Sequence, residues 1–333
     1  MKKNIVIVGA TGAVGREMVH CLHELKFPVD RLRLVASERS VGGRIETPFG
    51  SITIEPISEN VFKESDIALF SVGSELSLEW RERVVQNNCL MIDNSSAFRY
   101  ENETPLVIPE INPETAKTHH GVISNPNCTT AIAAVALYPL HREFGLKKVI
   151  VSTYQATSGA GAKGMQELLN QTQDYMNEAP MASHVFAHQI AFNLIPHIDA
   201  FQENGYTKEE MKVVWETQKI FGDDTIQISC TSVRIPTLRA HSESIVIETK
   251  NPITPEAARS VLRKSPGVKV VDDPSNNRYP MPINATQKFE VEVGRIRQNL
   301  VFGDHGLEFF VSGDQLLKGA ALNAVQIAEL FIN

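Results

Sequence analysis

The chain has 333 residues, of which 42% are hydrophobic and 21% charged. This length suits two domains, and this composition excludes a disordered chain, because enough apolar surface is available for cores of normal size. The formal net charge of −7 argues against non-specific binding to nucleic acid, since phosphate backbones attract cationic surfaces. The apolar runs are all shorter than the ~20 residues that a bilayer-spanning helix needs, so the sequence predicts no membrane partner.

The first third of the chain alternates strand and helix patterns. Apolar runs predict strands at Asn4–Val8, Arg31–Ala36, Ile67–Val72 and Leu90–Asp93, and helical periodicity predicts helices at 13–26 and 77–88. Strands that alternate with helices in this way form a parallel sheet with helices on both faces. The fold class predicted here is α/β, with an N-terminal doubly wound sheet of the Rossmann type.

Beyond about residue 145 the pattern changes to strands with fewer crossover helices. Strands are predicted at Val149–Thr153, Ile226–Val233, Glu243–Glu248, 294–300 and 307–312, and helices at 163–177, 207–221 and 254–265. This mixture predicts an α+β second domain. The last segment, Gln315–Phe331, is interpreted as an amphipathic helix.

A glycine-rich turn follows the first predicted strand. Gly9, Gly12 and Gly15 lie in GATGAVG, where a helix is predicted to begin. Glycine permits a tight turn there and lets a pyrophosphate approach backbone N–H groups at the helix N-terminus. The strand–turn–helix context therefore favours a dinucleotide site over a plain tight turn.

The end of the second predicted strand bears on the choice of cofactor. Its sequence, ASERS, places Glu38 where a carboxylate would bind a ribose 2′-hydroxyl and favour NAD. Ser37, Arg39 and Ser40 surround it, and an arginine with two hydroxyls suits a 2′-phosphate. We predict NADP and keep Glu38 as the alternative.

Cys128 is the most informative residue of the sequence. It lies in ISNPNCTT, directly before an Ala-rich apolar run that reads as a long buried helix. A thiolate at a helix N-terminus is stabilised by the macrodipole and by free N–H groups, which also suit an oxyanion. Beside a nicotinamide cofactor, such a thiol predicts hydride transfer to or from a thioester. The alternative is an inert buried cysteine.

The other cysteines predict no metal or disulfide chemistry. Cys21 and Cys89 are placed in predicted helices and Cys230 in a strand, so all three are interpreted as packing residues. The four cysteines form no CxxC pair, which indicates a reducing compartment, the cytoplasm, and no zinc site. His184 and His188 have the i, i+4 spacing of a shared helix face, but no carboxylate is suitably spaced for a metal.

Several motifs together resemble those of the aspartate-semialdehyde dehydrogenase family, in its bacterial branch with the shorter chain. They are GATGAVG, ASERSVGG, NPNCTT, VSTYQATSGAG, IAFNLIPHID, RIPTLRAHSES and LLKGAALNAVQIAE, in family order over nearly the whole chain. The resemblance implies reductive dephosphorylation of L-aspartyl 4-phosphate by NADPH to aspartate 4-semialdehyde and phosphate. It also implies a homodimer, with residues 1–127 plus the helix 315–333 binding NADP and residues 128–314 forming the catalytic and dimerisation domain.

The resemblance assigns a role to each matching residue. Cys128 resembles the acyl-thioester nucleophile, His241 the acid/base histidine and Gln155 the residue that orients the substrate or thioester. The residues that resemble substrate contacts are Arg234 for the α-carboxylate, Glu209 for the α-amino group, and Arg99 and Lys212 for phosphate, with Asn127 helping. Those that resemble cofactor contacts are Gly9, Thr11, Gly12, Ala13, Val14, Ser37, Arg39, Ser40, Ser158, Gly159 and Gln315.

Two kinds of alternative remain at this stage. One is a reductase for another acyl phosphate, such as N-acetylglutamyl phosphate, or a glyceraldehyde-3-phosphate-type dehydrogenase. The Glu209 and Arg234 pair argues against both, because a free amino group and a carboxylate each need a partner. The other alternative is a non-catalytic nucleotide-binding protein, which the presence of Cys128 and His241 disfavours.

Overall fold

The computed structural model describes residues 2–332, and the chain forms two compact units. Unit 1 consists of Met1–Asn127 and Ala320–Asn333, and unit 2 consists of Cys128–Gly319. The first division falls at 127/128, where the sequence analysis placed it. The second lies between Gly319 and Ala320, so residues 315–319 belong to unit 2.

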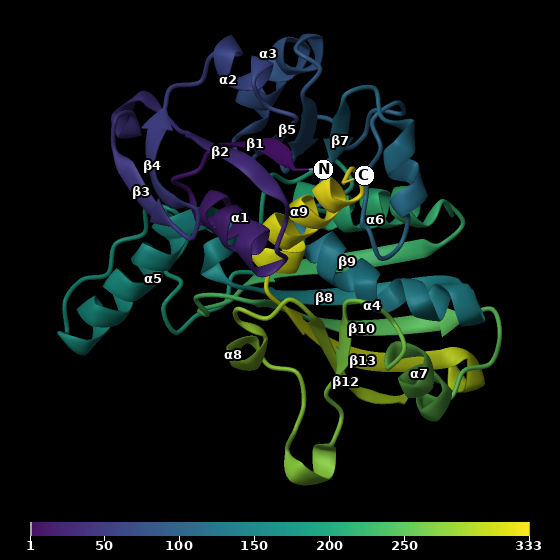
Figure 1. Cartoon of the computed structure of the whole chain (residues 1–333). Coiled ribbons are helices and arrows are strands. Elements are labelled where there is room, and N and C mark those ends of the chain that lie inside the picture. The colour runs from purple at the N-terminus through teal and green to yellow at the C-terminus, as the bar shows by residue number, and fades with distance from the viewer. Residues whose placement is uncertain (1, 333) are drawn as a thin grey trace. The chain divides into compact units, whose positions relative to one another are not determined.

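Unit 1 is built on a seven-stranded sheet of order β3-β4-β2-β1-β5-β6-β7, parallel except for the β3–β4 hairpin. Helices α1 and α9 pack together on one face, and α2 and α3 cover the other (Figure 1). The Rossmann-type doubly wound fold is therefore confirmed. The elements are β1 Lys3–Val8, α1 Ala13–Glu24, β2 Val29–Val35, β3 Arg44–Thr47, β4 Gly50–Glu55, α2 Glu59–Lys63, β5 Ile67–Phe70, α3 Ser74–Gln86, β6 Leu90–Asp93, β7 Val122–Ser124 and α9 Leu322–Glu329.

The central strands of unit 1 are buried on both faces, which explains their continuous apolar runs. Residues Ile5–Val8 of β1 and Ile67–Phe70 of β5 are all buried. On the α2 and α3 face, Phe62 stacks on Phe70 and contacts Trp80, with ring centroids 6.0 and 5.6 Å apart. This core holds the carboxyl ends of the strands in place, and the glycine turn follows the first of them.

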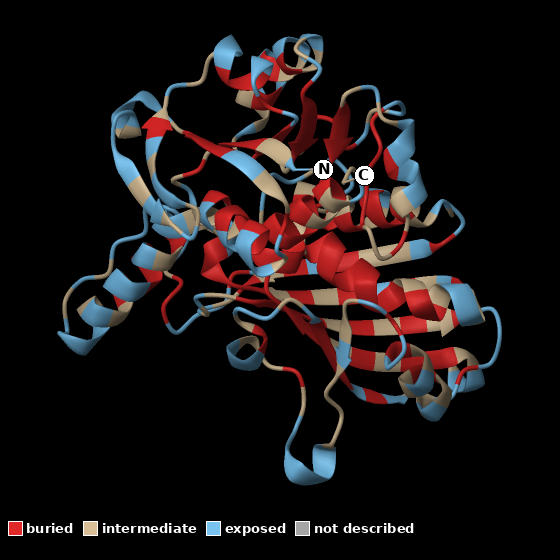
Figure 2. Cartoon of the chain, in the orientation of Figure 1, coloured by how far each residue is buried: buried red, intermediate tan, exposed pale blue. Residues whose placement is uncertain are grey.

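Two sequence interpretations are corrected, and one element was missed. Cys89 lies outside the helix, because α3 ends at Gln86 and Cys89 directly precedes β6. The β3–β4 hairpin was missed, since all of its strand residues except Ile54 are exposed or half-buried and it carries no long apolar run. The C-terminal segment is not one amphipathic helix: a π-helical turn, Leu317–Ala321, precedes α9, and α9 is buried on nearly all sides (Figure 2).

Unit 2 is built on a mixed six-stranded sheet of order β11-β12-β13-β10-β8-β9, in which β10 pairs antiparallel with both β8 and β13. Helix α4 packs against four of these strands and against α6 and α7. The predicted α+β second domain is therefore present. Its elements are α4 Cys128–Phe144, β8 Leu146–Gln155, α5 Gly161–Met176, α6 Lys208–Phe221, β9 Gln227–Arg234, β10 His241–Thr249, α7 Pro255–Leu262, β11 Val268–Val270, α8 Pro282–Ala285, β12 Val291–Gln298 and β13 Gly306–Gly313.

Two helices of unit 2 begin where the sequence analysis expected them. Helix α4 starts at Cys128 and is buried almost continuously from Thr129 to Leu140, as Figure 2 shows in red. Helix α6 begins after Thr207, whose hydroxyl accepts from the Glu210 N–H while the Glu210 carboxylate accepts from the Thr207 N–H. This capping box satisfies two N-terminal donors and fixes the first turn of α6, which carries Glu209.

The part of the chain from residue 2 to residue 332 contains neither a cluster of metal ligands nor a helix that could cross a membrane. His184 and His188 lie in a bent loop and share no helix face, which corrects that possibility. No group of three or more His, Cys, Asp and Glu side chains within these residues is arranged to hold a metal ion. None of the helices in this range is long and apolar enough to cross a membrane.

Candidate active site

The glycine turn of unit 1 opens into a cavity of about 490 Å³. Gly9 has a φ of +90°, and a Cβ on it would lie 2.2 Å from the Ser71 carbonyl oxygen, so only glycine fits. Gly9, Thr11 and Gly12 line the cavity, and α1 begins immediately afterwards with Ala13 and Val14. A bare backbone turn that leads into a helix N-terminus matches the requirements of a dinucleotide pyrophosphate.

The end of β2 forms another wall of the same cavity. Ser37 and Glu38 are among its lining residues, together with apolar and small side chains that the sequence analysis did not single out: Val35, Ala36, Ile57, Val72 and Leu76. Arg39 follows in a short 3-10 helix, where it is exposed, and Ser40 is half-buried. The cavity is therefore lined both by Ser37, predicted to favour NADP, and by Glu38, the alternative that would favour NAD.

Two predicted substrate residues belong to unit 1. Arg99 is 6% exposed and donates from Nε to the Asn125 carbonyl at 2.9 Å and from Nη2 to the Asn94 carbonyl at 2.7 Å. The Asn125 amide in turn donates to Asn94 Oδ1 and accepts from Asn323 Nδ2 of α9. Asn127 is buried and directly precedes Cys128. Backbone carbonyls thus fix the Arg99 guanidinium.

Cys128 and His241 meet within unit 2, although they are 113 positions apart in the sequence. The sulfur lies at the first residue of α4, half-buried, 3.6 Å from His241 Nε2. His241 is the first residue of β10 and is completely buried. Its other ring nitrogen, Nδ1, accepts a hydrogen bond of 3.0 Å from the Ala156 N–H. Burial, and then the charge of Arg234, lower the pKa of His241 well below its ordinary value.

Arg234 ends β9 beside this pair and is 6% exposed. Its Nη1 donates to the Ala156 carbonyl at 2.7 Å, and its guanidinium lies 5.8 Å from the Phe186 ring centroid. Burial lowers the pKa of Arg234, while the charges of Glu209 and Cys128 oppose that effect. A buried guanidinium beside the Cys128 sulfur is a local cation that can hold a carboxylate.

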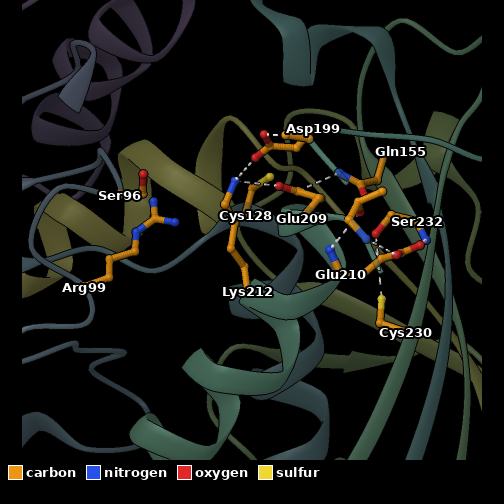
Figure 3. A network of polar contacts seen from close by, with 12 residues as sticks. Ser96, Arg99, Cys128, Gln155, Asp199, Glu209, Glu210, Lys212, Cys230 and Ser232 are labelled. Atoms are coloured by element: carbon orange, nitrogen blue, oxygen red, sulfur yellow. Dashed lines mark hydrogen bonds and ion pairs between the residues drawn. The ribbon is translucent and has the colours of Figure 1, made fainter. Parts of the chain in front are cut away.

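A chain of polar contacts joins the remaining predicted residues (Figure 3). Gln155 donates from Nε2 to Glu209 Oε1 at 3.1 Å, and Glu209 Oε2 accepts from Lys212 Nζ at 3.0 Å. Lys212 Nζ also donates to Asp199 at 2.7 Å. Burial lowers the pKa of Lys212, but the Glu209 charge and the hydrogen bonds to both carboxylates outweigh it, so the pKa is raised.

Asp199 was missed by the sequence analysis. It occupies a loop position with a left-handed φ of +69°, unusual for a residue with a side chain, and this conformation accompanies its ion pair with Lys212. Hydrogen bonding to Lys212 and to the Ala200 N–H outweighs burial and lowers the pKa of Asp199. Its place at the end of the IAFNLIPHID motif was the only signal in the sequence, and no spacing rule connects that position to α6.

The three other predicted cofactor residues lie in unit 2. A Cβ added to Gly159 would lie 2.6 Å from Arg234 Nη1 and 3.4 Å from His241 Nε2, so glycine is needed for the close approach. The Gln315 amide donates to the Ser158 hydroxyl and accepts from the Ala240 N–H, the residue before His241. These contacts place Gly159 and Gln315 next to the Cys128–His241 pair.

Comparison with known proteins agrees with this geometry. Residues 4–119 match the family model described as semialdehyde dehydrogenase, NAD binding domain, and residues 137–318 match its dimerisation domain. The chain is 51% identical to the aspartate-semialdehyde dehydrogenase of Aquifex aeolicus, over 100% of this chain and 98% of that one. It is 44% identical to that of Bacillus subtilis, over 98% and 96%. The chain belongs to the aspartate-semialdehyde dehydrogenase family.

Solved structures of the family agree as well. Aspartate semialdehyde dehydrogenase II from Vibrio cholerae, solved in complex with ASA, has a TM-score of 0.96 and 42% identity, covering 99% of this chain and 98% of that one. Family membership makes the chain an oxidoreductase whose unit 1 carries the nicotinamide dinucleotide site. It also decides against the other acyl-phosphate reductases and against a non-catalytic nucleotide-binding protein.

Proposed function

We propose that this chain catalyses the NADPH-dependent reductive dephosphorylation of L-aspartyl 4-phosphate to L-aspartate 4-semialdehyde, through a thioester on Cys128. The observation that carries the proposal is the approach of Cys128 Sγ to His241 Nε2 at 3.6 Å, at the first residue of a buried helix and beside buried Arg234. A thiolate in this position is stabilised by the helix N-terminus and by the guanidinium charge.

The sulfur begins the reaction as the nucleophile. It attacks the acyl carbon, the S–C bond forms, and the bond from that carbon to the phosphate oxygen breaks, so that phosphate leaves with the electron pair. When bound, the reduced dinucleotide supplies a hydride to the thioester carbon. The resulting oxyanion then re-forms its C=O bond and expels the Cys128 thiolate, which releases the aldehyde. The released thiolate is then ready for the next turnover.

The charged residues of unit 2 suit an amino-acid substrate. Arg234 is proposed to bind the α-carboxylate through its planar guanidinium, and Glu209 the α-amino group. Gln155, hydrogen-bonded to Glu209, is proposed to orient the acyl group. Lys212 is proposed to bind phosphate together with Arg99 and Asn127, since a dianionic leaving group needs cations and N–H donors.

NADP is the proposed cofactor, on the strength of residues at the end of β2. Ser37 is at the cavity, and Arg39 follows within two residues on an exposed turn that leaves its side chain accessible. Glu38 also lines the cavity, which keeps NAD as the competing choice. Ala13 and Val14, the first residues of α1, are proposed to present backbone N–H groups to the pyrophosphate.

A homodimer is proposed through the face of the unit 2 sheet opposite α4. Burial alternates along β10, so Ser244, Val246 and Glu248 are only half-buried between fully buried neighbours. Ile150 pairs with Val246 in register and is 46% exposed, and the Tyr154 and Phe310 rings meet nearby at 6.0 Å. Ile150→Asp should shift sedimentation toward the monomer, whereas Ile283→Asp, at an exposed isoleucine of α8, should not.

The direct test is the absorbance of NADPH formed from L-aspartate 4-semialdehyde, phosphate and NADP by the purified chain. The proposal expects turnover with this aldehyde and no comparable turnover with N-acetylglutamate semialdehyde, which lacks the free amino group. Preference for the acetylated aldehyde would contradict the roles of Glu209 and Arg234.

A further inference from the structure

Two side chains of α5 hold the loop that follows this helix. Glu167 is 6% exposed, and its carboxylate accepts the backbone N–H groups of residues 184–186 at 2.8, 2.6 and 3.2 Å. Gln171, one turn later in α5 and also buried, accepts from the N–H groups of residues 190–191 and donates to the Ala182 carbonyl. Hydrogen bonds to a carboxylate are stronger than those between neutral groups, so Glu167 should fix the backbone of residues 184–186 firmly.

Phe186 is the last residue that Glu167 anchors, and its ring lies between α5 and the active site. The ring packs against a small apolar cluster of α5 and the loop, which contains buried Leu168 and Ile190. Gly164 of α5 permits the approach, because a Cβ there would lie 3.1 Å from the Phe186 Cζ atom. The ring is therefore held twice by α5, through its backbone by Glu167 and through its packing at Gly164.

The Phe186 ring faces Arg234, the proposed ligand of the substrate α-carboxylate. The distance of 5.8 Å from Arg234 Cζ to the ring centroid is within the range of a cation–π contact. Such a contact depends on the charge of the guanidinium and takes the place of none of its hydrogen bonds. Nη1 of Arg234 also donates to the Ala156 carbonyl at 2.7 Å. The ring can therefore restrain the guanidinium while N–H donors remain for a carboxylate.

We propose that Glu167 and Phe186 are positioning residues for the substrate α-carboxylate: Glu167 holds the loop, the loop holds the Phe186 ring against Arg234, and the ring keeps the guanidinium in the orientation that binds the carboxylate. This inference rests on the proposed function and deepens it, because it names two residues through which affinity for the aldehyde is set. Neither is proposed to touch the reacting atoms. The affinities for phosphate and NADP should not depend on them.

Phe186→Leu is the first variant of the test, because leucine keeps an apolar side chain in the cluster and removes the ring. In the oxidative direction, the KM for L-aspartate 4-semialdehyde should rise about 2- to 30-fold, the usual worth of a cation–π contact. The kcat should stay within about threefold of wild type, since the nucleophile is untouched. The KM values for phosphate and NADP should not change.

Phe192→Leu is the matched control, because Phe192 lies in the same loop but is 62% exposed and contacts Tyr175. It should leave the KM for the aldehyde unchanged. An unchanged KM for the aldehyde in Phe186→Leu overturns the proposal. So does an equal rise in the KM for phosphate or NADP, which a general disturbance of the fold would produce.

Glu167→Gln tests whether the carboxylate acts through the ring. Glutamine has nearly the same shape, but its NH₂ group would oppose at least one of the backbone N–H groups that Glu167 accepts. The KM for the aldehyde should rise by no more than in Phe186→Leu. The double variant should have the KM of Phe186→Leu alone, because both changes remove the same contact. Independent increases that multiply in the double variant would overturn the proposed connection.

Two further variants complete this comparison. Glu178→Gln, at an exposed position just beyond α5, removes the same charge and should have no effect on the KM for the aldehyde. Glu167→Asp keeps the carboxylate but shortens its reach, and it takes the place of Glu167→Gln, with the same expectations, if the glutamine variant does not fold.

Nitrogen-15 spectra of the arginine side chains supply a second arm that needs no substrate. A guanidinium held over the face of an aromatic ring has its Nε–H proton shifted upfield by the ring current. The Arg234 signal, assigned by its loss in Arg234→Lys, should move downfield in Phe186→Leu and in the Glu167 variant, but not in Phe192→Leu. A signal unmoved by Phe186→Leu, or moved by Phe186→Leu and not by the Glu167 variant, overturns the proposal. Absence of turnover in the wild-type chain would instead contradict the proposed function.

Discussion

The dinucleotide cavity of unit 1 and the charged cluster of unit 2 are built on opposite principles. The cavity is formed mainly by backbone and small or apolar residues, with Gly9 where no side chain fits. The cluster consists of long polar side chains, His241, Arg234 and Glu209, at most 6% exposed. The first site is expected to select its ligand by shape, and the second by the positions of its charged groups. Substitutions in the first should therefore change cofactor binding, and substitutions in the second should change substrate binding and turnover.

Cys128→Ala should give the largest effect, because it should abolish turnover in unit 2 and leave cofactor binding in unit 1 nearly unchanged. Loss of the nucleophile should lower turnover by at least about 10⁴, as removal of a covalent nucleophile does in other enzymes. NADP binding, which depends on unit 1, should stay within about twofold of wild type, measured by calorimetry. Cys21→Ala, at a packing cysteine of α1, is the matched control and should keep its turnover. Substantial turnover by Cys128→Ala would show that the reaction does not pass through a thioester on Cys128.

Arg234 tests whether the charged cluster selects ligands by geometry. Arg234→Ala should raise the KM for the aldehyde roughly 10- to 150-fold, since a lost hydrogen bond to a charged group costs about 1.5–3 kcal/mol, and should lower kcat by misplacing the carbonyl. Arg234→Lys should be nearly as damaging, because an ammonium lacks the bidentate fork. Lys212→Ala should instead raise mainly the KM for phosphate. If Arg234→Ala weakens phosphate alone, the substrate is bound in the reverse orientation.

Arg39 tests the cavity of unit 1. Arg39→Ala should raise the KM for NADP by about 10-fold and leave the KM for NAD nearly unchanged, because the guanidinium is proposed to meet only the 2′-phosphate. Glu38→Gln is the matched variant for the competing hypothesis and should affect mainly NAD. Equal losses for both cofactors in Arg39→Ala would make Arg39 structural and favour Glu38.

Glu243 gives the smallest expected effect, on stability. It lies two residues after His241 in β10, completely buried, and neither carboxyl oxygen has a hydrogen-bond partner among the described residues. Burial raises its pKa well above the ordinary value. Above about pH 4.3 the Glu243 carboxyl is therefore still protonated in the folded chain but ionised in the unfolded chain. The free energy of unfolding consequently falls as the pH rises above that value.

Glu243→Gln should remove this cost, and the gain in Tm should be larger at pH 8 than at pH 5. In a chain of this size each ~1 kcal/mol corresponds to a shift in Tm of about 1–2 °C. Glu143→Gln, at an exposed position of α4, should show no such difference between the two pH values. A Tm difference for Glu243→Gln that is independent of pH would mean that the carboxyl is not held protonated.

The same contrast explains what the sequence could predict. The glycine turn, the start of α4 at Cys128 and the start of α6 after Thr207 depend on residues close together in the chain, and all three were predicted. The 3.6 Å approach of Cys128 to His241 depends on the pairing of β10 with β8, which no local pattern specifies. The family resemblance named Cys128 and His241 as residues of one site, and the structure shows the distance between them.

Other features were missed because their cause is tertiary. Asp199 reaches Lys212 from a loop position with left-handed backbone, which no local pattern of the sequence predicts. The segment after β13 begins with a π-helical turn, in which Gly319 passes so close to Cys128 that a Cβ there would lie 2.7 Å from the Cys128 Cβ. This close approach joins residues far apart in the chain, so no local pattern encodes it.

The most direct test of the central claim is to run the oxidative half-reaction without phosphate. With L-aspartate 4-semialdehyde and NADP, the account predicts a rapid burst of up to one NADPH per chain, followed by a thioester that mass spectrometry finds on the peptide with Cys128. Cys21, Cys89 and Cys230 should stay unmodified, because all are buried and burial raises the pKa of Cys89 to about 12 and that of Cys230 above its ordinary value. Steady turnover without a burst and with unmodified Cys128, or acylation of another cysteine, would contradict the account.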